Sequence, residues 1–355
     1  MNALASIKEP VRNRYSRSIH WLSMALTVVV FFLIWVGGLV TTYDAGMAVP
    51  DWPGTYGWNM FAYPASTWLF GPFDLLVEHG HRLLGSLAGL LSIGLVVAAF
   101  RMDGRKWFRW WSIFILAAVI AQGALGGARV VLDQRTFAMI HGCTGPLFFA
   151  FATATAVMSS RWWRQWDSQT GCSTARTGFE EARNSSVGQY ATGAGIRFLA
   201  LALLLFSYCQ LVLGAQLRHV TGLVSHKLFK GFVHGHLGLA AIVLLLSLSL
   251  FVSVWFSRAV PGKVRRAASL LAIAVLVQIG LGIGTWIVNY ALPWSDLNQA
   301  LAEYTISSKG YWESLVVTAH VAVGSLIISL STVIVLRGWR SRSLPEEAKV
   351  AVSAI

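Results

Sequence analysis

The chain contains eight runs of mostly apolar residues, each long enough to cross the hydrocarbon core of a bilayer as a helix. Charged residues make up only 12% of its 355 residues, about half the share that is typical of a soluble domain. In lipid every backbone polar group must be paired internally, and helices do this within each segment. The sequence therefore predicts an all-α integral membrane protein with eight transmembrane helices at 17–41, 75–100, 108–131, 136–159, 194–217, 228–256, 266–290 and 312–337.

The distribution of basic residues predicts the orientation of these helices. The net charge of +13 would suit a nucleic-acid partner, but lysine and arginine are concentrated in alternate connections. They gather before the first run, in the second, fourth and sixth connections, and after the last run, whereas 42–74 has none. This is the positive-inside pattern. It predicts a multi-pass protein of a bacterial-type inner membrane with both termini cytoplasmic, whose partner is the lipid bilayer and not nucleic acid.

The two halves of the chain resemble each other, which indicates an internal duplication. Glu78-His79-Gly80-His81 matches Val233-His234-Gly235-His236, and Gln122 with Gly126 matches Gln278 with Gly282. Repeats of this kind occur in membrane proteins. The sequence predicts two pseudo-symmetric four-helix bundles, with the N-terminal half at 1–160, a cytoplasmic linker at 161–193, the C-terminal half at 194–340 and a cytoplasmic tail at 341–355.

Four histidines lie at a similar depth in every second apolar run: His81, His141, His236 and His320. Ionisable side chains inside a membrane are costly and are functional candidates by default. One ligand per helix, from two helices per half, does not suit a tetrahedral zinc site. Two imidazoles that face each other across a gap suit a six-coordinate haem iron in a four-helix bundle. The pattern predicts two bis-histidine haem sites, one in each half.

A polar cluster distinguishes the first half from the second. Because positions three and four apart share a helix face, Glu78, His81 and Arg82 are expected to point broadly the same way. A carboxylate one turn from a haem ligand, in a largely apolar site, could exchange protons with a reacting group. The second half has Val233 and Leu237 at the matching positions. This difference favours one catalytic site and one electron-transfer site.

Several cations and small residues are expected to surround the haem groups. Arg82, Arg129 and Arg218 lie towards the outer face and could bind haem carboxylates, although arginines there also snorkel to the interface. Glycines in the third and seventh runs either allow close helix packing or leave room for a flat macrocycle. The aromatic residues of 42–74 either form an interfacial belt or belong to a lid over a site at the outer face.

At these residues the chain resembles the haem A synthase family over nearly its whole length. The resemblance rests on Glu78-His79-Gly80-His81-Arg82, His141-Gly142, Gly235-His236, Ala319-His320 and Gly46-Met47-Ala48-Val49-Pro50-Asp51-Trp52-Pro53. It implies oxidation of a porphyrin methyl group of haem O to a formyl group, giving haem A for terminal oxidase assembly. It also implies that His81 and His141 flank the substrate haem O, that Glu78 is essential, and that His236 and His320 ligate haem b.

The resemblance further implies haem O synthase and terminal oxidase assembly factors as partners, together with an electron donor that the sequence does not identify. A homo-oligomer is compatible with the sequence. Two positions depart from the family pattern. The loop 42–74 lacks the cysteine pair that some members carry, and Thr41 stands where many members have an arginine after Gly37-Gly38.

Other functions fit parts of the same pattern. A non-catalytic di-haem electron-transfer protein of b type would explain the four histidines but not Glu78 or the divergence of the halves. A haem transporter or chaperone would bind haem and leave its ring unmodified. A proton-coupled carrier would use the histidines directly and would contain no haem.

Overall fold

The computed structural model describes residues 16–164, 193–219, 224–257, 260, 262–290 and 310–340. Within these ranges eight helices are long and apolar enough to cross a membrane, which confirms the predicted fold class. Each predicted helix end lies within four residues of the observed one. The helices are α1 (Arg17–Thr42), α3 (Phe73–Met102), α4 (Lys106–Leu132), α5 (Arg135–Ser159), α8 (Ala194–Arg218), α9 (His226–Phe256), α10 (Gly262–Tyr290) and α11 (Tyr311–Arg340). Most of the predicted linker and the whole predicted tail lie outside the described residues.

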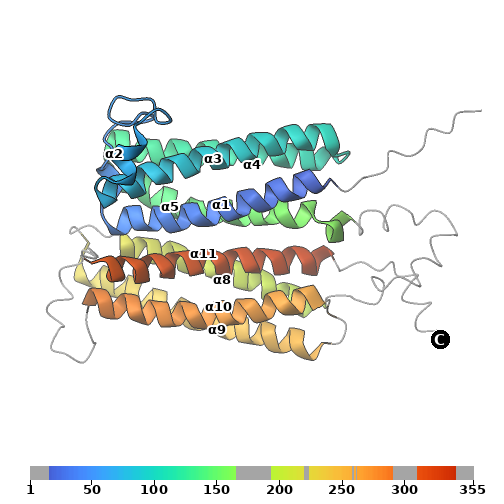
Figure 1. Cartoon of the computed structure of the whole chain (residues 1–355). Coiled ribbons are helices and arrows are strands. Elements are labelled where there is room, and N and C mark those ends of the chain that lie inside the picture. The colour runs from blue at the N-terminus through green and yellow to red at the C-terminus, as the bar shows by residue number, and fades with distance from the viewer. Residues whose placement is uncertain are drawn as a thin grey trace, which may run out of the picture.

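The long helices lie side by side in two groups of four (Figure 1). In the first group the contacts form a closed ring, because α1 packs on α3, α3 on α4, α4 on α5 and α5 on α1. The second group repeats this ring with α8, α9, α10 and α11 in the same order. Equivalent helices therefore make equivalent contacts, as expected from the duplicated sequence.

Each group buries its own apolar core. The outward faces of the helices are apolar as well. The residues of each core therefore differ from those of the outward faces in burial and not in hydrophobicity. Buried side chains of the first core include Leu26, Leu95, Phe108 and Ile115, and those of the second include Leu203, Leu250, Leu271 and Ile334.

The two groups meet through α1, α5, α8 and α11. Helix α5 contacts both α8 and α11, and α1 contacts α11. Gly38 on α1 lies against Thr318 on α11, and a small residue at such a contact lets two helices approach closely. At one point the buried hydroxyls of Thr153 on α5 and Ser329 on α11 form a hydrogen bond of 2.7 Å. The boundary is thus a packed interface that includes polar contacts within the membrane span.

A buried acidic residue fixes the end of the bundle where α3 turns into α4. The carboxylate of Asp103 accepts hydrogen bonds from the guanidinium of Arg105 at 3.0 and 2.9 Å, and it also contacts Arg164. Burial by itself would raise the pKa of Asp103, but these hydrogen bonds and positive charges hold it below its usual value. Arg105 also donates to the carbonyl of Met158 at the end of α5. The cluster therefore ties the α3–α4 turn to α5.

The connection between α1 and α3 covers the opposite end of the first group (Figure 1). It contains a short 3-10 helix, Ala45–Met47, and the short helix α2, Ala65–Leu69. His81 lies two turns into α3 from this end, so the connection is next to the histidines and far from Asp103.

Candidate functional site

The structure brings the four histidines together as two pairs, one within each group of helices. The imidazole of His81 on α3 lies opposite that of His141 on α5, with ring centroids 6.2 Å apart. His236 on α9 and His320 on α11 are opposed in the same way, with centroids 6.4 Å apart. Each pair joins the second and fourth long helices of its group.

A glycine on the preceding long helix supports each histidine. Ideal Cβ atoms built at these glycines would lie 2.8 to 3.4 Å from the Cε1 atom of the imidazole. A larger side chain at these positions would therefore displace the ring. The four supports are Gly37 for His81, Gly126 for His141, Gly214 for His236 and Gly282 for His320.

Glutamine amides lie beside both histidines of the second pair. The side-chain nitrogen of Gln210 is 3.2 Å from Nε2 of His236, and that of Gln278 is 3.5 Å from Nε2 of His320. The amide oxygens of both glutamines are buried without a hydrogen-bond partner among the described residues. The second pair therefore has a polar group at each ring.

Each of these glutamines precedes its supporting glycine by one helical turn, and Gln122 precedes Gly126 in the same way. The backbone carbonyl oxygen of Gln122 lies 3.2 Å from Nδ1 of His141. At the fourth support, Leu33 takes the place of the glutamine. Three of the four supports share one sequence pattern, a glycine that follows a glutamine by one turn in the helix before the histidine. This pattern could have identified them from the sequence.

The spacing of the rings fits a single metal ion held between each pair. A metal–imidazole bond of about 2 Å puts the ring centroid about 3.2 Å from the metal, so two opposite imidazoles would have centroids about 6.4 Å apart. Within the described ranges, Cε1 and Nδ1 of each imidazole lie closest to its supporting glycine, so Nε2 is the ring nitrogen left for a metal bond. In the same ranges no group of three or more His, Cys, Asp or Glu residues surrounds a metal position. These observations suit an axially ligated haem iron better than a tetrahedral ion.

Glu78 faces the connection between α1 and α3. Its side chain is buried, and its carboxylate accepts hydrogen bonds from the backbone N–H of Val49 at 3.0 Å and from Arg82 at 2.7 Å. The sequence predicted a largely apolar site that Glu78 shares with His81. This was wrong in detail, because the partners of Glu78 are an ion pair and a backbone amide that arrives from the loop.

Arg82 is also committed to the loop. Its guanidinium donates to the backbone carbonyl oxygens of Val49 at 2.7 Å, Asp51 at 2.6 Å and Gly54 at 2.9 Å. Charge-assisted hydrogen bonds of this kind are stronger than neutral ones. The sequence predicted that Arg82 binds a haem carboxylate, and any such contact would compete with these three bonds.

His79 completes the attachment of the loop to α3. Its Nδ1 lies 3.1 Å from the hydroxyl of Thr55, and its ring packs against Tyr63 and Trp68, with centroids 5.4 and 5.0 Å away. The ring is almost completely buried. Glu78, His79 and Arg82 thus hold the loop from one helix, while His81 faces His141.

The loop segment 45–58 has an ordered structure of its own. The Asp51 carboxylate accepts hydrogen bonds from the backbone N–H groups of Tyr56 and Gly57. Burial would raise the pKa of Asp51, but these bonds and the Arg82 charge hold it below its usual value. The Trp52 ring lies where a side chain at Gly127 would stand. The loop therefore reaches α4 beside Gly126, the support of His141.

The remaining predicted cations lie in the last turns of α4 and α8. The Arg129 guanidinium packs against Gly46 of the loop. Arg218 donates to the carbonyl oxygen of Gly38 at 2.8 Å and to the hydroxyl of Thr42 at 2.6 Å. Arg218 was predicted to serve as a carboxylate ligand at the outer face. Its observed contacts are with α1, in the other half of the molecule.

The family model described as cytochrome oxidase assembly protein, COX15-CtaA, matches residues 20–237, more than half of the chain. The chain belongs to this family. The matched range contains His81, His141 and His236 but ends before His320. His320, which lies outside the matched range, shares the packing against glycine and is paired with His236.

Curated relatives of this COX15-CtaA chain are named "Heme A synthase". The protein of Geobacillus kaustophilus is 24% identical over 208 residues, which cover 57% of this chain and 57% of that protein. That of Symbiobacterium thermophilum is 27% identical over 210 residues, covering 58% and 60%. That of Staphylococcus aureus strain JH9 is 27% identical over 125 residues, covering 35% and 39%. The chain thus matches less than two thirds of the length of each.

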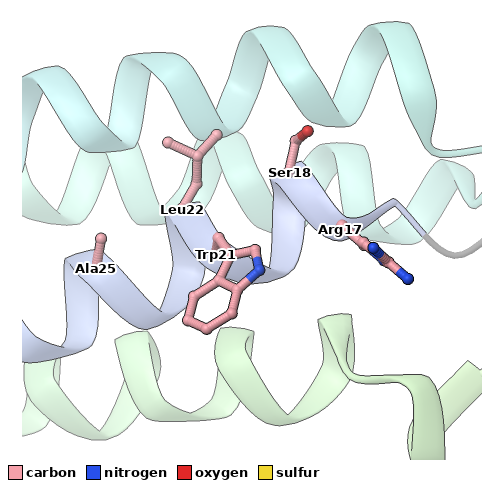
Figure 2. Close-up of a pocket in the computed structure, with 5 residues that line it drawn as sticks. All are labelled: Arg17, Ser18, Trp21, Leu22 and Ala25. Atoms are coloured by element: carbon pink, nitrogen blue, oxygen red, sulfur yellow. The ribbon is translucent and has the colours of Figure 1, made fainter.

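A surface feature at the start of α1 does not belong to the histidine site. A shallow hollow at the start of α1 is lined by Arg17, Ser18, Trp21, Leu22 and Ala25 (Figure 2). Gly37 lies more than three turns further along α1, about 18 Å from Ala25. An exposed tryptophan beside an arginine is typical of a membrane interface.

The glycine supports lead to a prediction that has a matched control. In Gly282→Ala the new Cβ would lie 3.1 Å from Cε1 of His320, and overpacking of this kind typically costs about 1–3 kcal/mol. At Gly280 no atom of the described residues outside its own helix lies within 4 Å, so Gly280→Ala should be neutral or stabilise by up to about 1 kcal/mol. Thermal unfolding of the detergent-solubilised protein, together with its haem absorbance, measures both effects. Equal behaviour of the two variants would exclude a supporting role for Gly282.

Proposed function

We propose that this chain is a haem A synthase, which oxidises a methyl group of haem O to a formyl group and so provides haem A for terminal oxidase assembly. The observation that carries the proposal is the presence of two histidine pairs of nearly equal spacing but unequal surroundings. One pair lies beside Glu78, Arg82 and an ordered loop. Family membership and relatives named "Heme A synthase" support the same function.

The first pair is the proposed substrate site. His81 and His141 would hold the iron of haem O and so fix the orientation of its ring, and the glycine supports would fix the orientation of the two imidazoles. The loop over the outer end of α3 and α4 would exclude water from the reacting edge. Glu78 would act at this site either by holding the loop through Val49 or by exchanging a proton.

The second pair is the proposed resident haem b site, held by His236 and His320. Haem b, when bound, supplies a redox centre that exchanges single electrons. Conversion of a methyl to a formyl group removes four electrons from the carbon and adds one oxygen atom, which either water or molecular oxygen would supply. Water as the source releases electrons and molecular oxygen as the source consumes them, so a redox centre near the substrate would serve either route. Val233 and Leu237, which replace Glu78 and Arg82 here, provide no acid, base or loop clamp; Leu237 is 59% exposed. The second half is therefore suited to hold a cofactor.

The proposed cellular setting follows from charge and from the relatives. The basic connections support an orientation with both termini in the cytoplasm, and the compared relatives come from bacteria, which suits a bacterial inner membrane. The histidine pairs and the loop would then lie towards the outer face. A haem O synthase would supply the substrate, and oxidase assembly factors would receive the product.

Haem typing tests the proposed function. The protein is co-expressed with a haem O synthase and purified, and its haems are extracted and separated by chromatography. We expect haem A or its hydroxylated precursor beside haem b, and the absence of both oxidised forms in His81→Ala. Haem b alone, with haem O available, would contradict the proposal and favour a di-haem electron-transfer protein. A protein without haem would favour a proton-coupled carrier.

A further inference from the structure

A compact polar cluster joins the two halves near the outer end of α1. The hydroxyl of Thr42 donates to the carbonyl oxygen of Gly38 at 2.6 Å and lies 3.3 Å from the hydroxyl of Thr318 on α11. Arg218, from α8, donates to that carbonyl and to Thr42. We name Gly38, Thr42, Arg218 and Thr318 the boundary cluster. It connects one helix of the first half with two helices of the second.

Packing at the boundary cluster is as close as its hydrogen bonding. A Cβ built at Gly38 would lie 2.8 Å from Cγ2 of Thr318, so α1 and α11 approach at a contact that only glycine permits. Thr42 and Thr318 are both buried. Closely packed interfaces have few alternative arrangements. A shift of α1 must therefore be accompanied by a shift of α11.

The boundary cluster adjoins the supports of two histidines and lies close to a third histidine. Gly38 follows Gly37, which supports His81. Thr318 precedes His320 by two residues on α11, and Arg218 lies one turn after Gly214, the support of His236. A displacement of His81 that moves α1 is therefore passed to the helices that carry the second pair.

We propose that the boundary cluster couples the two histidine pairs, so that haem binding at the first pair changes the axial ligand geometry at the second. The residues of the boundary cluster act as positioning residues, since none of them is an axial ligand. This inference rests on the proposed function, because it requires haem at both pairs. A coupling of this kind would let the electron-transfer site respond to the presence of substrate.

Electron paramagnetic resonance of the full-length protein tests the coupling. The g values of a low-spin haem report the geometry of its two axial imidazoles. His81→Ala, which disables the first pair, gives the signal of the second pair alone. In the otherwise unchanged protein, loading the first pair with added ferric haem b is expected to shift the g values of the second pair. Thr318→Val should lose this shift while both haems remain bound.

Two variants serve as controls. Thr153→Val also removes a buried hydrogen bond between the halves, but at a site away from the histidine supports, and it should retain the shift. Thr318→Ser keeps the hydroxyl and should retain it as well. No shift in the unchanged protein, an equal shift in Thr318→Val, or an equal loss in Thr153→Val would overturn the coupling. Absence of haem from either pair would overturn the proposed function, and with it this inference.

Discussion

Glu78→Ala is expected to abolish the conversion of haem O while haem b still co-purifies with its low-spin spectrum unchanged. The substitution removes the acceptor for Val49 N–H and the only carboxylate bonded to Arg82 among the described residues. Removing one partner of a buried ion pair typically costs about 3–5 kcal/mol, because the other charge stays buried. That cost falls on the first half, while His236 and His320 lie in the second.

The size of the effect separates two roles for Glu78. Loss of an acid–base group typically lowers the rate about 10²–10⁴-fold. Glu78→Gln keeps an oxygen that can accept from Val49 N–H but cannot exchange a proton in the same way. If Glu78 acts by proton exchange, Glu78→Gln should be as inactive as Glu78→Ala. If it acts by holding the loop, Glu78→Gln should retain part of the activity, and Arg82→Met should be as defective as Glu78→Ala.

Both readouts can be made on the same preparations. Haem extraction and chromatography measure the product, and hydrogen exchange of segment 45–58 measures the order of the loop. The conservative control is Asn59→Ala. The side-chain oxygen of Asn59 accepts a hydrogen bond from the backbone N–H of Phe61 within the loop, and among the described residues this side chain makes no hydrogen bond to α3. Full activity of Glu78→Ala would remove this residue from the mechanism and leave the ion pair with Arg82 as a purely structural feature.

The sequence predicted the helices well, because lipid leaves few choices for an apolar run. Once each run had to be a helix, the depth of a histidine within its run determined its height in the bundle. The duplicated pattern then paired helices two and four within each half. The sequence could therefore predict two pairs, His81 with His141 and His236 with His320.

The sequence could not predict contacts made by backbone groups of the loop. The ion pair between Glu78 and Arg82 follows from helical spacing, but Val49 N–H and the carbonyl of Asp51 are 29 and 31 residues away from their partners. No side-chain pattern marks such groups. The attachment of the loop to α3 could therefore not be predicted from the sequence.

Contacts between the halves were also beyond the sequence. Arg218 lies in the last turn of α8, but its bond to Gly38 spans 180 residues and depends on how two bundles pack. A duplicated sequence predicts two similar halves without fixing the surface through which they meet. The four glycine supports are an intermediate case, since three of them share the glutamine one turn earlier and Gly37 does not.

Loss of the low-spin haem signal is expected in the double variant His236→Ala/His320→Ala. With both imidazoles removed, the second pair no longer offers a ring nitrogen to the iron. Each single variant should lose or shift the signal, since a six-coordinate iron needs both ligands. Absorbance spectroscopy of the purified protein, with haem quantified after extraction, measures the change.

The matched control for these variants is His234→Ala. His234 lies on the same helix as His236 and corresponds in sequence to His79, but its side chain is exposed and it is not part of either pair. It should leave the spectrum unchanged. The first pair provides a second comparison, because His81→Ala should prevent formation of haem A while the low-spin signal of the second pair persists. An unchanged spectrum in both His236→Ala and His320→Ala would exclude this pair as the haem b site, and the division into a substrate half and a cofactor half would then have no support.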